Sequence, residues 1–106
     1  MKTCFFHLMP YQGLPDDFTD HHKSAWVDLP NENFNPELAN GYYADFIEEL
    51  EYADSVGFDG ICVNEHHSNA YGMMPSPNLL ASILSRSTSK SALIVFIFSC
   101  VGLKSL

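Results

Sequence analysis

Residues 58–67 read FDGICVNEHH, and this stretch indicates the fold class. The apolar run 61–63 predicts a short buried strand, which ends in four polar residues, Asn64, Glu65, His66 and His67. In parallel α/β proteins, ligands bind and chemistry occurs at the carboxyl ends of the strands. An imidazole at such an end can act as a general base or acid near neutral pH.

Two further segments predict strands that flank this one. Residues 4–9 are apolar except for His7 and stop at Pro10, and the run 92–100 is β-branched and aromatic. Both are expected to be buried. Strands without polar alternation, separated by helices, indicate a parallel sheet in the order β-α-β-α-β. Right-handed crossovers would then bring the ends of the first two strands to one edge.

The two helices are predicted from apolar spacing and from their terminal residues. Residues 40–56 carry apolar side chains at the spacing of one helical face, and Gly57 suits a carboxyl-terminal cap. Ser76 and Pro77 are expected to open the second helix, since serine caps and proline suits the first turn. Its predicted buried face consists of Leu79, Leu80, Ile83 and Leu84.

Residues 11–40 are rich in Asp, Asn and Pro and predict a long irregular segment. Long segments of this kind within a compact domain are usually functional or disordered. Trp26, together with Phe18 and Phe34, gives this one aromatic surface to pack, so we expect an ordered cover over the mouth of the site.

Composition narrows the class of protein. The chain has 106 residues, 46% of them hydrophobic, which predicts one globular domain. Its net charge of −8, with only five Lys and Arg, disfavours binding to nucleic acid or to an anionic membrane surface. Three cysteines without Cys-x-x-Cys spacing indicate a reducing, cytoplasmic compartment. The apolar run 92–103 is too short to span a membrane.

Several readings of the polar run are open. Alternation along the strand places His66 on one side and Glu65 with His67 on the other. Adjacent histidines therefore rarely supply two ligands to one ion, and no metal site is predicted. A solvated loop with a helix-capping role is the simplest alternative. The aromatic residues Tyr42, Tyr43 and Phe46, at helical spacing, are expected to be core rather than a stacking platform.

The chain resembles the bacterial luciferase-like, flavin-dependent monooxygenases over residues 1–90. The resemblance rests on the run GFDGICVNEHH at 57–67, the opening FHLMPY at 6–11, the helix 43–56, Tyr71-Gly72, and SPNLL at 76–80. It implies the amino-terminal part of a (β/α)8 barrel, here incomplete, because a full barrel needs about 250 residues.

The resemblance also implies a function. Family members use reduced FMN and O2 to oxygenate a small organic substrate, and a flavin reductase supplies the reduced flavin. By this resemblance His66 is the catalytic base, Glu65 lies beside the flavin, and Asn64 is a weaker cofactor-binding candidate. Full-length relatives are expected to include oligomers.

Residues 91–106 diverge from the family pattern, so we expect a truncated, inactive fragment. Two other functions are open. One is a non-catalytic flavin-binding or interaction fragment. The other is a metal-dependent TIM-barrel hydrolase that uses His66 or His67 as ligands.

Overall fold

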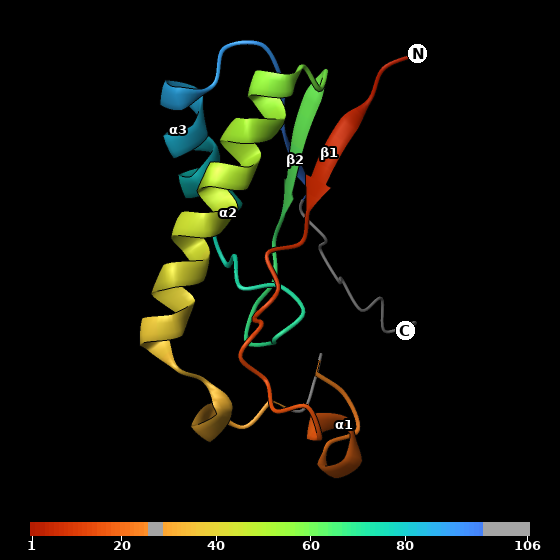
Figure 1. The fold of residues 1–106 in the computed structure, drawn as a ribbon, viewed down its shortest axis with the longest axis vertical. Helices are drawn as coiled ribbons and strands as arrows, with labels where there is room; N and C mark the ends of the chain where they lie inside the picture. The colour runs from red at the N-terminus through yellow and green to blue at the C-terminus, as the bar shows by residue number, and fades with distance from the viewer. Residues whose placement is uncertain (26–28, 97–106) are drawn as a thin grey trace, which may run out of the picture.

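A computed structural model describes residues 1–25 and 29–96 (Figure 1). The elements follow in the order β1 (Cys4–His7), α1 (Phe18–His21), the 3-10 helix η1 (Asn31–Asn33), α2 (Pro36–Val56), β2 (Gly60–Asn64), α3 (Pro77–Ser87) and β3 (Ala92–Phe96). The predicted β-α-β-α-β order is therefore confirmed, with two short helical segments added in the long loop. The described residues form a small α/β unit with a three-stranded sheet.

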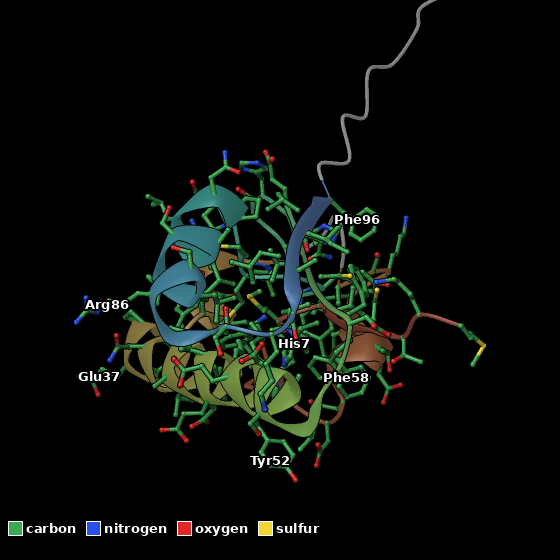
Figure 2. The ribbon with its side chains drawn as sticks, turned by 90° about the horizontal axis from the view of Figure 1, so that it is seen from above. His7, Glu37, Tyr52, Phe58, Arg86 and Phe96 are labelled. Carbon is green, nitrogen blue, oxygen red and sulfur yellow. The ribbon has the colours of Figure 1, made fainter. Side chains whose placement is uncertain are left out.

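The three strands form one parallel sheet in the order β1-β2-β3. Helix α2 packs on β1 and β2, and α3 packs on β2 and β3. Figure 1 shows both helices on the same side of the strands. Figure 2 shows Phe96 on the side of β3 that faces away from α3. Among the described elements, helices therefore cover only one face of the sheet, and we call the other the open face.

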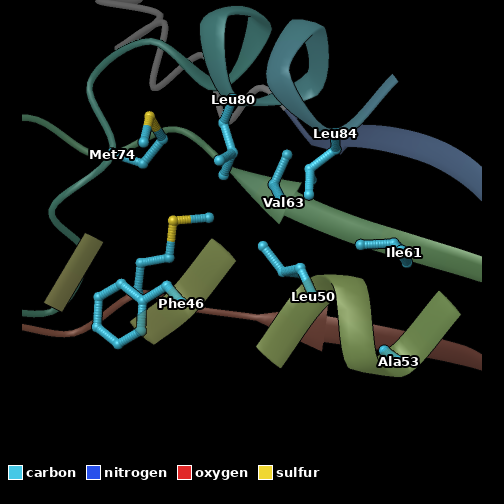
Figure 3. Packing of buried hydrophobic residues seen from close by; sticks show 9 residues of the cluster. Phe46, Leu50, Ala53, Ile61, Val63, Met74, Leu80 and Leu84 are labelled. Atoms are coloured by element: carbon cyan, nitrogen blue, oxygen red, sulfur yellow. The ribbon is translucent and has the colours of Figure 1, made fainter. Parts of the chain in front are cut away.

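The core lies between the sheet and the two helices. Ile61 and Val63 of β2 face the helices, where they meet Phe46 and Leu50 of α2 and two leucines of α3 (Figure 3). Because side chains alternate along a strand, Asn64 points toward the open face. The cluster also contains Met9, Ala53 and Met74.

The open face is apolar and is bridged by two aromatic rings. Phe6 of β1 and Phe96 of β3 are both partly exposed, and their ring centroids lie 5.8 Å apart in a T-shaped arrangement. Strands on either side of a central strand are about 10 Å apart. The two rings therefore lean toward each other across β2.

The predicted outer strands differ from the observed ones. β1 ends at His7 instead of Met9, because Nδ1 of His7 accepts a hydrogen bond from the N–H of Met9 and Met9 takes a left-handed backbone with φ 51°. Neither outer strand is buried throughout, because one face of each is uncovered. β3 ends at Phe96 within the described residues, and the predicted positions 97–100 lie outside them.

The predicted helices need two corrections. α2 begins at Pro36 instead of residue 40, because the Asn35 side chain caps the N–H groups of Glu37 and Leu38. α3 begins at Pro77 as predicted, but only Leu80 and Leu84 of its predicted face are buried, whereas Leu79 and Ile83 are exposed.

Of the predictions about the end of α2 and about the long loop, the structure tests only the first. Gly57 caps α2 with φ 94°, as predicted. Trp26 lies outside the described residues, so its expected packing over the site stays a prediction. Within residues 1–25 and 29–96, each helix is too short or too polar to cross a membrane.

A buried carboxylate holds the opposite, amino-terminal edge of the sheet. The side chain of Asp54 accepts hydrogen bonds from three consecutive backbone N–H groups, those of Ser89 (3.1 Å), Lys90 (2.9 Å) and Ser91 (2.7 Å). These bonds, led by that of Ser91, lower the pKa of Asp54 from 3.8 to about 2. This carboxylate fixes the turn between α3 and β3 to the end of α2.

We expect Asp54→Asn to lower the melting temperature at neutral pH, because an amide cannot accept three backbone bonds as a carboxylate does. A lowered pKa stabilises the folded chain above the unfolded value. The difference from wild type should therefore shrink as the pH falls from 3.8 toward about 2. Asp45→Asn, at an exposed position of the same helix, is the control. A difference independent of pH would contradict this account.

Candidate functional site

The site lies at the carboxyl edge of the sheet, where the loops after β1 and β2 meet. Two backbone hydrogen bonds join these loops, from Met73 N–H to Met9 O (2.8 Å) and from Tyr11 N–H to Ala70 O (2.9 Å). A third, from His66 N–H to Met74 O (2.9 Å), lies within the loop after β2. Asn69 holds the turn within the second loop, since its side chain accepts from Tyr71 and Gly72 and donates to the carbonyl of His67. The two loops therefore form one ordered floor, as their predicted common edge required.

His66 is buried in this floor and is 8% exposed. Its ring lies edge-on to Tyr71, with centroids 5.3 Å apart. A Cβ atom added to Gly72 would lie 2.4 Å from Cδ2 of His66, so only glycine allows the loop to approach the ring. Burial lowers the pKa of His66 below its ordinary value of 6.5, and the neighbouring His67 lowers it further. The imidazole is therefore neutral at pH 7 and suited to accept a proton.

A cavity of about 290 Å³ lies beside His66 at the carboxyl edge of the sheet. Aromatic side chains from three segments line it: Tyr11 after β1, Phe34 before α2, and Tyr43 within α2. The hydroxyl of Tyr11 accepts from the N–H of Asn35 at 2.9 Å, and that of Tyr43 donates to the carbonyl of Met73. Both rings are thus fixed by bonds to the backbone around the cavity.

Glu65 and Asn64 do not line this cavity. The carboxylate of Glu65 accepts from Nε2–H of the exposed His67 at 2.6 Å, so these two side chains share one side. As predicted, Glu65 and His67 lie together, and of these three residues only His66 lines the cavity. β2 ends at Asn64, so this arrangement belongs to the loop and not to the strand. The structure therefore does not bring the predicted base and the predicted cofactor-binding residues into one cavity.

Asn64 is the most unusual polar residue of the described chain. It is 1% exposed, and neither its Nδ2 nor its Oδ1 has a hydrogen-bond partner within residues 1–25 and 29–96. A buried polar group without a partner costs about 1–3 kcal/mol. This amide lies at the end of β2 on the open face, opposite Phe96 in register. It offers one donor group and one acceptor group at the carboxyl edge.

The described residues contain no group of three or more His, Cys, Asp or Glu arranged to hold a metal ion. The hydrolase alternative therefore has no ligand set in this part of the chain. Of the two histidines only His66 lines the cavity, and His67 already pairs with Glu65.

Sequence reasoning missed the cavity and most of its lining. It assigned Tyr43 to the core, and this residue does pack against the core cluster, but it also lines the cavity. It also gave no role to Gly72, although the Asn-x-x-Gly pattern at 69–72 is a turn signal that could have located the loop against the ring. Nothing in the sequence linked Tyr11 to Phe34, which lies 23 positions later.

Comparisons of the chain with protein-family models, with curated proteins and with solved structures gave no match.

We expect His66 to titrate at a lower pH in the folded chain than in the chain unfolded by urea, because burial penalises its charged form. The imidazole chemical shifts of both states, followed by NMR against pH, measure this difference. Because the folded pKa is depressed, the folded chain should lose stability as the pH falls below 6.5. His66→Gln assigns the signal and should remove this part of the pH dependence. A folded midpoint equal to or above the unfolded one would contradict the burial of this ring.

Proposed function

We propose that this chain forms the first units of a flavin-dependent monooxygenase, in which reduced FMN and O2 oxygenate a small organic substrate. The observation that carries the proposal is His66, a buried imidazole with a lowered pKa at the carboxyl edge of a parallel sheet. A flavin reductase in the cytoplasm would supply the reduced flavin. The similarity to the luciferase-like family supports the assignment of roles.

His66 is proposed as the catalytic base. Its ring is held by the packing of Gly72 and Tyr71 and by the backbone bond from its own N–H to Met74. A fixed, neutral and largely buried imidazole can take a proton from a substrate bound beside it. Positioned general bases of this kind contribute about 10²–10⁴-fold to a rate.

Asn64 fits the flavin ring system. The edge of an isoalloxazine carries alternating N–H and C=O groups, and the buried amide of Asn64 has one donor group and one acceptor group without partners among the described residues. When bound, the reduced flavin would supply the electrons that activate O2. Glu65, adjacent in sequence, is the second candidate to lie beside it, and its carboxylate is already oriented by His67.

The open face supports a larger assembly around this unit. A parallel sheet is normally covered on both faces, yet the described helices cover only one face here. The exposed Phe6 and Phe96 would be buried if further chain covered this face, as the inward-facing residues of a barrel are. We propose that this face is the inner surface of a (β/α)8 barrel.

A non-catalytic flavin-binding unit is the second candidate function, and one observation favours it. None of the residues in the three strands is Lys or Arg, so the strand surface around Asn64 offers no cation to a flavin phosphate. Flavin bound through Asn64 alone would be recognised by its ring and not by its phosphate. The isolated chain would then bind flavin weakly and not turn over.

We expect Asn64→Leu to abolish flavin binding and, at the same time, to stabilise the fold. Leucine removes the unpaired amide at similar volume, so the free energy of unfolding should rise by about 1–3 kcal/mol. Urea unfolding and flavin fluorescence titration measure the two effects. A purely structural Asn64 would instead give a destabilised variant, and unchanged flavin binding would contradict its proposed role.

The same titration includes a ligand control. Riboflavin and FMN should bind residues 1–106 with similar, weak affinity, because the three strands around Asn64 offer no Lys or Arg to the phosphate. FMN saturating at low micromolar concentration while riboflavin does not would show a phosphate site that this account lacks.

We expect His66→Ala to lower oxygenation by about 10²–10⁴-fold, with flavin affinity changed much less. The reaction should be measured in a complete barrel that carries this segment, with reduced FMN and O2 supplied. His21→Ala is the control, since that imidazole is exposed on α1 and pairs only with the exposed Asp17 in the described structure. Equal rates for wild type and His66→Ala would remove His66 as the base.

A further inference from the structure

The aromatic side chains that line the cavity beside His66 are positioned by contacts within the protein. Tyr11 and Phe34 lie with ring centroids 5.3 Å apart, and the hydroxyls of Tyr11 and Tyr43 are engaged by backbone groups. Because these hydroxyls are already hydrogen-bonded, the rings offer a ligand mainly their carbon atoms. The two tyrosine rings are therefore ordered without a ligand, which removes the entropic cost of ordering them on binding, whereas Phe34 is 45% exposed and packs on Tyr11.

The lining of the cavity carries no formal charge in its described part. None of the described residues that line it is Asp, Glu, Lys or Arg, and its polar groups include the His66 ring, Asn31 and Ser68. The His66 ring is neutral at pH 7 because its pKa is lowered. An ion entering this space would lose water without gaining an opposite charge, which is costly. The chain's net charge of −8 opposes anions further.

The size of the cavity limits the ligand. Drug-sized ligands occupy pockets of about 300–1,000 Å³, and this cavity, at about 290 Å³, lies below that range. A molecule of one ring with a small substituent fits such a space, whereas a complete isoalloxazine with its ribityl chain does not. We therefore place the proposed flavin outside this cavity, beside Asn64.

We propose that this cavity binds an uncharged, planar one-ring aromatic molecule with a hydroxyl group, such as a simple phenol. The aromatic walls would contact its ring through edge-to-face and offset arrangements, and the uncharged polar groups of Asn31 and Ser68 suit a neutral hydroxyl. That this molecule is the substrate rests on the function proposed above. Its binding does not, because the cavity and the Asn64 face are separate.

The test is a ligand panel titrated into residues 1–106 without flavin and followed by NMR of the ring signals. Each ligand has a single six-membered ring, and the panel varies its charge and its aromaticity: 4-methylphenol, benzoate, phenyltrimethylammonium and 4-methylcyclohexanol. We expect 4-methylphenol to bind at least about tenfold more tightly than each of the others, since it alone is both neutral and aromatic. It should shift the signals of Tyr11, Tyr43 and His66.

A pair of variants locates the binding. Phe34→Ala removes one aromatic wall and should weaken 4-methylphenol binding by about tenfold, as expected for losing one aromatic contact of about 1.4 kcal/mol. Tyr52→Ala removes an exposed aromatic ring from the far half of α2 and should leave the affinity unchanged. Circular dichroism of both variants establishes that the fold is retained. If Phe34→Ala does not fold, Phe34→Leu replaces it.

Several outcomes would overturn the proposal. Tightest binding of phenyltrimethylammonium would make the cavity a cation–π site, and tightest binding of benzoate would show an unrecognised cation. Equal loss in Phe34→Ala and Tyr52→Ala would mean unspecific contact, and no binding of 4-methylphenol would leave the cavity without this ligand. The flavin proposal is tested separately, because Asn64→Leu should abolish flavin binding while 4-methylphenol still binds.

Discussion

The hydrogen bond from the N–H of Met9 to Nδ1 of His7 determines how the first strand leaves the sheet. Because Nδ1 accepts, Nε2 carries the proton and donates to Glu49 of α2 at 2.7 Å. The buried His7 ring also packs on Phe46, with centroids 4.7 Å apart. Helix, strand and loop are thus tied through one imidazole, and the left-handed Met9 that follows turns the chain over the sheet edge.

This turn positions the candidate site. The carbonyl of Met9 accepts from Met73, which follows Gly72, and a Cβ at Gly72 would lie 3.0 Å from the carbonyl of Leu8. The loop that presses on His66 is therefore held by the chain that His7 redirects. His7 contributes to the site through backbone geometry, without lining the cavity itself.

Sequence patterns predicted those parts of the fold that depend on local rules. Gly57 and Pro77 mark helix ends because of their backbone preferences. The patterns failed where tertiary contacts decide. The exposed Leu79 and Ile83 reflect a helix that packs through only part of its apolar surface. The cavity joins Tyr11 and Phe34 across a segment whose path no periodicity describes. The patterns also failed at the end of β1, where a local bond from the Met9 N–H to the His7 side chain, which no apolar pattern shows, ends the strand.

The size of the open face indicates what can cover it, and its Asn64 end lies close in the chain to His66. Three strands about 4.8 Å apart, one of four residues and two of five, present about 220 Å², well below the roughly 800 Å² per partner of a stable protein interface. A second copy pairing through this face alone would therefore be weak, which favours a cover continuous with the sheet. Asn64 on this face and His66 in the cavity are two residues apart. Side chains two residues apart share a side of an extended strand, and β2 ends at Asn64, so the chain leaves the strand geometry between them. A flavin ring beside Asn64 and a small aromatic molecule beside His66 would then meet around the end of β2.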